Sequence, residues 1–176
     1  MDLVKKHDYD SYLAGLLCPK ESRDAYFAIK SFNVEIAMIK DNTHNNLMAG
    51  RLRFQWWRDL INEVYNGVEG GKVSSLSKSP IAQAISSSVS QHDLSQRWFE
   101  RSLDARQRDL NSEQPETLDM LEDYAEQGHS SIQYLILESL GVRDEASEYA
   151  TSHIGVCSGL TTILRAFPYH AAQVSH

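Results

Sequence analysis

The apolar residues of this chain recur at intervals of three and four, and strand-like alternation of apolar and polar residues is nearly absent. This spacing puts apolar side chains on one face of an α-helix, so it predicts an all-α protein. One such run follows Pro19 and reaches about Lys40, and a second covers residues 46–66. Pro suits the first turn of a helix, and Gly67 suits the position after a helix end. We therefore expect a bundle of helices.

The second run carries the clearest buried stripe, which consists of Gly50, Phe54, Trp57, Ile61 and Val64. Trp56 lies one position, about 100°, away from this stripe. We therefore expect Trp57 to be buried and Trp56 to be more exposed.

Capping signals predict where the next two helices begin. Ser79-Pro80 indicates an N-cap followed by a first-turn proline, for a helix that reaches about Ser90. Asp93-x-x-Gln96 fits a capping box for a helix over about 94–110.

Two further helices are predicted in the second half of the chain. The first follows Pro115 and has an apolar stripe of Leu118, Leu121, Ala125, Gly128, Ile132 and Leu135. Gly141-Val142 predicts a Schellman ending for it, and Asp144 is expected to cap a last helix that reaches about Phe167. The expected buried face of this last helix is Tyr149, Ala150, His153, Cys157, Leu160, Thr161 and Leu164.

The length of 176 residues suits one domain, and we expect residues 1–176 to form a single helical unit. The Gly- and Ser-rich residues 67–79 predict an internal flexible loop, and residues 171–176 a divergent tail. Cys18 and Cys157 provide no disulfide framework, and no apolar run reaches the ~20 residues that span a bilayer. The first residues show no presequence.

The net charge of −7 argues against nucleic acid as a partner, because binding a phosphate backbone needs a basic surface. Arg51, Arg53 and Arg58 nevertheless alternate with aromatic residues on the predicted second helix. Arg51, Arg53, Trp56 and Arg58 therefore form a candidate surface for binding a ligand or a lipid headgroup. The competing interpretation is an ordinary amphipathic helix of the core.

The last predicted helix places His153 and Cys157 four residues apart, so both could reach one metal ion. A zinc site needs three or four ligands, and no third lies at a diagnostic spacing, which favours packing instead. Gly155-x-x-x-Gly159 on the same helix predicts the close approach of another helix.

Four segments, in the same order, resemble the squalene/phytoene synthase family. They are residues 28–41, 51–61, 121–126 and 153–170. Phe32-Asn33-Val34-Glu35, the block from Arg51 to Trp57 and the ending from Leu164 to His170 are most similar to the branch of this family that assists assembly of mitochondrial respiratory complex I.

The resemblance implies an isoprenoid-synthase-type helical bundle, here partial because the C-terminal helices are missing. Active members of the family bind Mg²⁺ through two aspartate-rich motifs, and the metal ions hold a prenyl diphosphate. The matching positions are Ala37 and Asp41 in the first motif and Thr162, Ala166 and His170 in the second. One carboxylate cannot hold a cluster of metal ions. We therefore expect no catalytic residue, no metal ligand and no cofactor, and Mg²⁺ only if the chain were an active enzyme.

The resemblance thus implies a non-catalytic assembly factor for complex I, on the matrix side of the mitochondrial inner membrane. Its expected partners are complex I subunits or assembly intermediates, and a peripheral contact with membrane lipid stays open. The alternatives are an active prenyl-diphosphate condensing transferase of isoprenoid biosynthesis, a generic helical interaction module, and a truncation product without function.

Overall fold

The computed structural model describes residues 1–43, 46–66, 79–110 and 117–174, with side chains described up to residue 166. Within these ranges every regular element is helical and no strand occurs, which confirms the all-α prediction. The elements are α1 (Asp2–His7), α2 (Tyr9–Leu17), α3 (Lys20–Ala37), α4 (Ile39–Asn42), α5 (Leu47–Asn66), α6 (Pro80–His92), α7 (Gln96–Leu110), α8 (Leu118–Ala125), the π-helix η2 (Glu126–Ser130), α9 (Ser131–Ser139) and α10 (Glu145–Val174).

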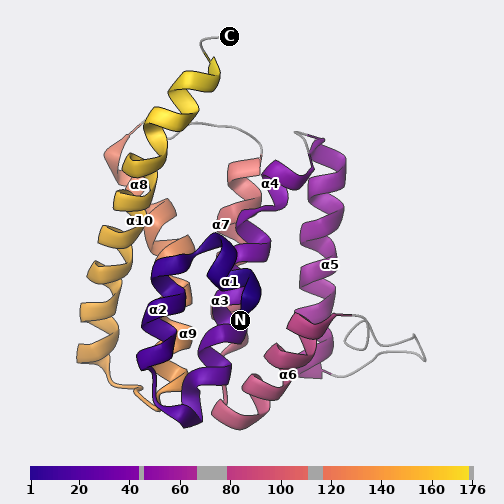
Figure 1. Cartoon of the computed structure of the whole chain (residues 1–176), viewed down its shortest axis with the longest axis vertical. Coiled ribbons are helices and arrows are strands. Elements are labelled where there is room, and N and C mark those ends of the chain that lie inside the picture. Colours follow the sequence, from indigo (N-terminus) through magenta and orange to yellow (C-terminus); the bar gives the residue numbers. More distant parts are fainter. Residues whose placement is uncertain (44–45, 67–78, 111–116, 175–176) are drawn as a thin grey trace.

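The helices pack around α3, which lies near the middle of the bundle in Figure 1. It contacts α6 and α9, while α5 packs against α7. Helix α10 packs against α8, η2 and α9. The short helices α1 and α2 contact each other and α3. No helix is predicted from sequence for residues 1–17, yet α1 and α2 form there, and the Asp8 carboxylate caps α2 by accepting a hydrogen bond from the backbone N–H of Ser11 at 3.2 Å.

An aromatic cluster forms the centre of the core. The ring of Phe32 meets Trp57 at a centroid distance of 5.1 Å and Phe99 at 5.2 Å, both edge to face. Trp57 is 1% exposed, whereas Trp56 is only partly buried. The helical phase predicted for α5 is therefore confirmed.

The boundary of α6 is confirmed, but the capping box predicted for α7 is wrong. Ser79 caps α6 by accepting a hydrogen bond from the backbone N–H of Ala82. Asp93, in contrast, adopts left-handed geometry (φ 52°) at the end of α6. The residue before α7 is held by a distant partner, because the buried carboxylate of Glu138 accepts hydrogen bonds from the backbone N–H of Ser95 at 2.8 Å and from its hydroxyl at 2.6 Å.

The Schellman ending after α9 is confirmed. Gly141 has a φ of +76°, its N–H donates to the carbonyl of Glu138, and the N–H of Val142 donates to the carbonyl of Leu137 at 3.0 Å. Asp144 then caps α10 by accepting a hydrogen bond from the N–H of Ser147 at 2.9 Å, also as predicted.

The helix predicted after Pro115 is not continuous, because η2 separates α8 from α9. The predicted apolar stripe nevertheless stays largely inward through the π-helical turn, because Ala125 and Gly128 are buried and Leu121 is partly buried. Ile132 and Leu135 are buried as expected, but Leu118 is 63% exposed.

The face predicted to be buried on α10 is wrong. Tyr149 and Leu164 are 70% and 71% exposed, and Gly155 and Gly159 are the buried positions. A Cβ on Gly155 would lie 2.2 Å from Ser130 Oγ, and one on Gly159 would lie 2.7 Å from the Cβ of Ala125. The close approach predicted for these two glycines is therefore confirmed.

Two predicted segments fall largely or partly outside the described residues. Of the loop predicted at 67–79, only Ser79 is described. Of the tail predicted at 171–176, the backbone is described to Val174, where α10 ends beyond the predicted Phe167.

Candidate functional site

The positions that match the first aspartate-rich motif lie at the end of α3 and in α4. Ala37 is the last residue of α3, and Asp41 is exposed in α4. The neighbouring Lys40 is directed away toward α7, where its ammonium donates to the carbonyl of Asp109 at 3.1 Å and pairs with its carboxylate at 3.5 Å. Asp41 therefore stands beside an ion pair and not beside a second free carboxylate of the motif.

The positions that match the second motif lie on the C-terminal half of α10. Thr162 is exposed, and its hydroxyl donates to the carbonyl of Ser158 at 2.8 Å. Ala166 is partly buried, and the side chain of His170 lies outside the described part of the chain. These positions supply no carboxylate, so the donor set of the two motifs does not fit a cluster of Mg²⁺ ions. Within the described residues, no group of three or more His, Cys, Asp or Glu side chains could hold a metal ion.

Buried basic groups lie next to the Glu126 carboxylate in the interior around η2. Lys30 on α3 is 9% exposed, and burial lowers the pKa of its ammonium, while the charge of Asp8 acts in the opposite direction. Burial, together with the charges of Arg106 and Lys30, lowers the pKa of His129 to about 4. Arg106 donates to the phenol oxygen of Tyr124 at 2.8 Å. The two neighbouring positive charges and burial therefore favour the neutral form of the His129 imidazole.

The candidate surface on α5 divides between two sides of the helix. Arg53 pairs with Glu35 on α3 at 3.2 Å, and its guanidinium lies 4.6 Å from the ring centroid of Trp56. Arg58 faces the opposite neighbour, α7, and pairs with Asp104 at 2.6 Å. Arg51 is exposed. The structure therefore does not bring these four residues together around one ligand.

An open cleft of about 430 Å³ lies beside Arg58. Its lining residues are Arg58, Asp104, Gln107, Arg108 and Gln127. Arg58 also donates to Gln107 at 3.0 Å, and Arg108 donates to Gln127 and pairs with Asp123 at 3.7 Å. Both guanidinium groups are thus engaged by side chains of the protein itself.

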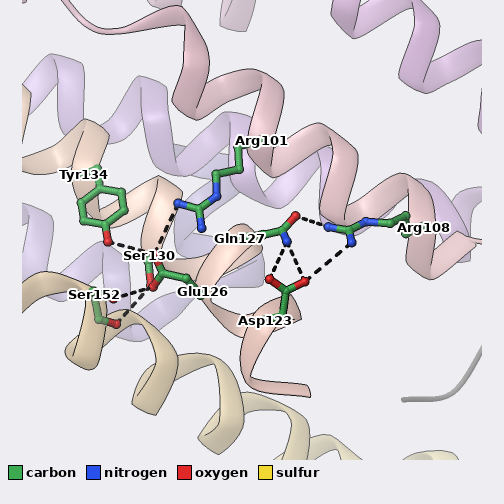
Figure 2. A network of polar contacts seen from close by, with 8 residues as sticks. All are labelled: Arg101, Arg108, Asp123, Glu126, Gln127, Ser130, Tyr134 and Ser152. Carbon is green, nitrogen blue, oxygen red and sulfur yellow. Dashed lines mark hydrogen bonds and ion pairs between the residues drawn. The ribbon is translucent and has the colours of Figure 1, made fainter. Parts of the chain in front are cut away.

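One highly connected polar group that sequence reasoning missed is Glu126 in η2. Figure 2 shows its carboxylate among donors from three other helices. It accepts hydrogen bonds from Arg101 of α7 at 3.3 Å, from the phenol of Tyr134 of α9 at 2.9 Å and from the hydroxyl of Ser152 of α10 at 2.8 Å. The hydroxyl of Ser130 also reaches α10, where it donates to the carbonyl of Ser152 at 3.2 Å.

This environment lowers the pKa of Glu126. Burial by itself would raise the pKa, but the hydroxyls of Ser130, Ser152 and Tyr134 and the charge of Arg101 together outweigh it. An ionised carboxylate has no proton to donate. Its role here is to connect helices through the hydrogen bonds that it accepts. No periodic signal could have identified it, because its partners come from separate elements.

His153 and Cys157 are both exposed, so the packing role expected for them within the chain is wrong. His153 stacks edge to face on Tyr149 at a centroid distance of 4.7 Å.

Among the residues with described structure, no helix is both long and apolar enough to cross a membrane.

Known proteins match this chain along almost its whole length. Complex I assembly factor 6 of Bos taurus is 37% identical over 173 residues, and the Homo sapiens protein is 36% identical, in each case over 98% of this chain. The homolog of this factor in Drosophila melanogaster is 33% identical over the same share. The chain spans about half the length of these relatives: 50%, 50% and 51%. No solved structure matches it.

The family itself is assigned by a match over residues 4–175 to squalene/phytoene synthase. The match includes the α3 and α10 segments in which the motif positions lie. This chain belongs to the squalene/phytoene synthase family.

Proposed function

We propose that this chain acts in the assembly of mitochondrial respiratory complex I and that it does so without catalysing prenyl transfer. The observation that carries the proposal is the 36–37% identity, over 98% of the chain, to relatives named as complex I assembly factor 6. The proposed partners are complex I subunits or assembly intermediates, and the proposed location is the matrix side of the mitochondrial inner membrane.

The missing negative charge at the motif positions is the reason to expect no catalysis. A diphosphate leaving group needs metal ions that neutralise it as the C–O bond ionises, and such ions need several carboxylate ligands. Asp41 is the one carboxylate at the described motif positions, and it is exposed. A family scaffold of this kind acts by binding at its surface.

Deletion of the gene in its own organism tests the proposal. We expect less assembled and active complex I on native gels, together with unchanged squalene and carotenoid-type products. Reintroduced Asp41→Asn should restore complex I fully, because a binding scaffold does not use this carboxylate. Trp57→Ala, which removes a core side chain, should not restore it.

The purified chain provides the second arm of the test. Incubation with farnesyl or geranylgeranyl diphosphate and Mg²⁺ should yield no C30 or C40 hydrocarbon above the blank without protein. Product above the blank, lost in Asp41→Asn, would overturn the non-catalytic part of the proposal. Normal complex I with depleted isoprenoids in the deletion strain would overturn the assembly role as well.

A further inference from the structure

Lys30 is a buried cation without a carboxylate partner among the described residues. It lies on α3 and is 9% exposed, and its Nζ lies 6.0 Å from the centre of the Tyr26 ring. Within the described chain, no hydrogen bond or ion pair reaches its ammonium. Lysine and arginine are rarely buried unless an anion pairs with them, because an uncompensated charge in the interior is costly.

Arg106 on α7 is a second cation of this kind. Its guanidinium donates a hydrogen bond to the phenol oxygen of Tyr124 at 2.8 Å, and it forms no ion pair with a described residue. Its Nε is buried and has no hydrogen-bond partner in the described part of the chain. A guanidinium has five N–H donors, so Arg106 keeps donors for a further acceptor.

Both cations lie near the imidazole of His129 in η2. The charges of Arg106 and Lys30 both act on this imidazole and, together with burial, lower its pKa to about 4. The neutral imidazole offers one N–H donor in addition to the two charged groups. Three side chains from α3, α7 and η2 therefore present donors to the same part of the interior.

Two buried hydroxyl groups on the same side of the bundle also have no partner in the described chain. Ser102 lies one turn before Arg106 on α7, and Ser131 follows His129 by two residues; both are 0% exposed. A buried polar atom without a hydrogen-bond partner is uncommon and calls for a specific cause, such as an ordered water or an ion.

The packing of α3 on α9 places Ser131 at the height of Lys30. The hydroxyl of Ser22 donates to the carbonyl of Ser139 at 2.8 Å, and the two helices run in opposite directions in Figure 1. Eight residues further along α3 and eight residues back along α9 lie Lys30 and Ser131. Since both helices rise by 1.5 Å per residue, these two positions share one level of the bundle.

The acidic groups that act on this region are engaged elsewhere. The Glu126 carboxylate accepts hydrogen bonds from three other helices. Asp8 caps α2 through its bond with the N–H of Ser11, and it acts on Lys30 and His129 only through its charge. Neither carboxylate therefore provides the counter-charge in direct contact that the two cations need.

This basic cluster differs from the aspartate-rich motif positions in place and in chemistry. Lys30 precedes Ala37 on α3 by seven residues, about 10 Å along the helix axis. The described helices themselves enclose Lys30 and the Nε of Arg106, so a small ligand fits between them better than a further segment of protein. His129 and Tyr124 are half-buried, which leaves a way in from solvent.

We propose that Lys30, Arg106 and His129 form a binding site for a small oxyanion of the phosphate type, held between α3, α7 and η2 without a metal ion. Lys30 and Arg106 supply positive charge, and the imidazole N–H and the hydroxyl of Ser131 supply neutral donors. The bound anion provides the counter-charge that the two cations lack. This inference does not depend on the proposed role in complex I assembly.

Titration of the purified chain with sodium phosphate in the presence of EDTA tests the site, with sodium chloride at equal ionic strength as the reference. We expect a saturable change of the His129 imidazole signals in NMR spectra, and a higher pKa of His129 because an adjacent anion favours its protonated form. Lys30→Met should raise the dissociation constant for phosphate at least about tenfold. The matched control is Lys40→Met, which removes the lysine that pairs with Asp109 and should leave the dissociation constant within about twofold.

Circular dichroism checks that the variants fold. If Lys30→Met does not fold, Arg106→Gln provides the second variant, and we expect the same loss of phosphate binding from it. Phenyl phosphate distinguishes the sources of the anion: binding as tight as that of phosphate assigns the site to phosphate esters, and weaker binding assigns it to the free ion. A response to phosphate that does not saturate, an equal response in Lys30→Met and Lys40→Met, or binding that requires Mg²⁺ would overturn the proposal.

Discussion

The carboxylate of Glu126 accepts a hydrogen bond from the hydroxyl of Ser152 at 2.8 Å, and this bond joins η2 to α10. The same carboxylate also receives the phenol of Tyr134 and the guanidinium of Arg101 (Figure 2). One side chain therefore connects α7, α9 and α10. This explains how α10, which is anchored on glycines rather than on large apolar side chains, is held in register on the bundle.

Glu126→Gln should destabilise the protein at neutral pH. The amide keeps the size of the side chain but loses the charge that three donors solvate, and such a loss typically costs ~1–3 kcal/mol of unfolding free energy. Urea denaturation measures the change. Glu122→Gln is the matched control, because Glu122 is exposed on α8 and its replacement should change stability by less than about 0.5 kcal/mol.

The pH dependence of stability gives an independent check on Glu126. Its pKa is lower in the folded protein than the ordinary value of 4.5, so the folded state favours the ionised form. The resulting stabilisation is present above the unfolded pKa and is lost as the pH falls through the folded pKa. Wild type should therefore lose more stability than Glu126→Gln between about pH 5 and pH 3. Parallel stability curves for the two proteins would contradict this.

Gly155→Ala should destabilise the protein although it lies within a helix. In an exposed helix this change normally stabilises by about 0.5–1 kcal/mol. Here the new Cβ would lie 2.2 Å from Ser130 Oγ and 2.6 Å from Ser130 Cα, so α10 must move away from η2. We expect a loss of ~1–3 kcal/mol in thermal or urea denaturation. Ser158→Ala, exposed on the same helix, serves as the control and should be nearly neutral.

The phase of α5 could be predicted from sequence, whereas that of α10 could not. On α5 the large apolar residues Phe54 and Trp57 define the buried face, so periodicity alone identifies it. On α10 the buried face is defined by Gly155 and Gly159, which carry no apolar side chain. The apolar stripe of α10 is real, but the described chain does not cover it. Periodicity reports which face is apolar, and not whether a partner is present.

The carboxylates that connect distant helices could not be predicted from sequence either. Glu126 and Glu138 lie in helices where a carboxylate is ordinarily a solvated residue. Glu138 is nonetheless 6% exposed, because Ser95 and the indole N–H of Trp98, about 40 positions earlier, donate to it. Such contacts arise only once the bundle brings distant segments together, so local patterns contain no signal for them.

Trp57→Ala should destabilise the protein far more than Trp56→Ala. Trp57 is 1% exposed and packs edge to face on Phe32, so its truncation should cost ~3–5 kcal/mol. Trp56 is partly buried and lies over the guanidinium of Arg53, so we expect a clearly smaller loss. Denaturation midpoints of the two variants measure the difference, and equal losses would contradict the helical phase on which both predictions rest.

His129 should remain neutral well below the pH at which an ordinary histidine ionises. Burial, with the charges of Arg106 and Lys30, lowers its pKa from 6.5 to about 4. Its neutral form therefore contributes stability above about pH 6.5, and this contribution is lost as the pH falls toward 4. An NMR titration of the imidazole, assigned with His129→Gln, measures the pKa directly. Lys30→Met removes one of the two positive charges that disfavour the protonated imidazole. If the fold is kept, the pKa of His129 should therefore rise. A wild-type His129 that titrates near 6.5 would show that water reaches the imidazole beside η2 and would contradict this prediction.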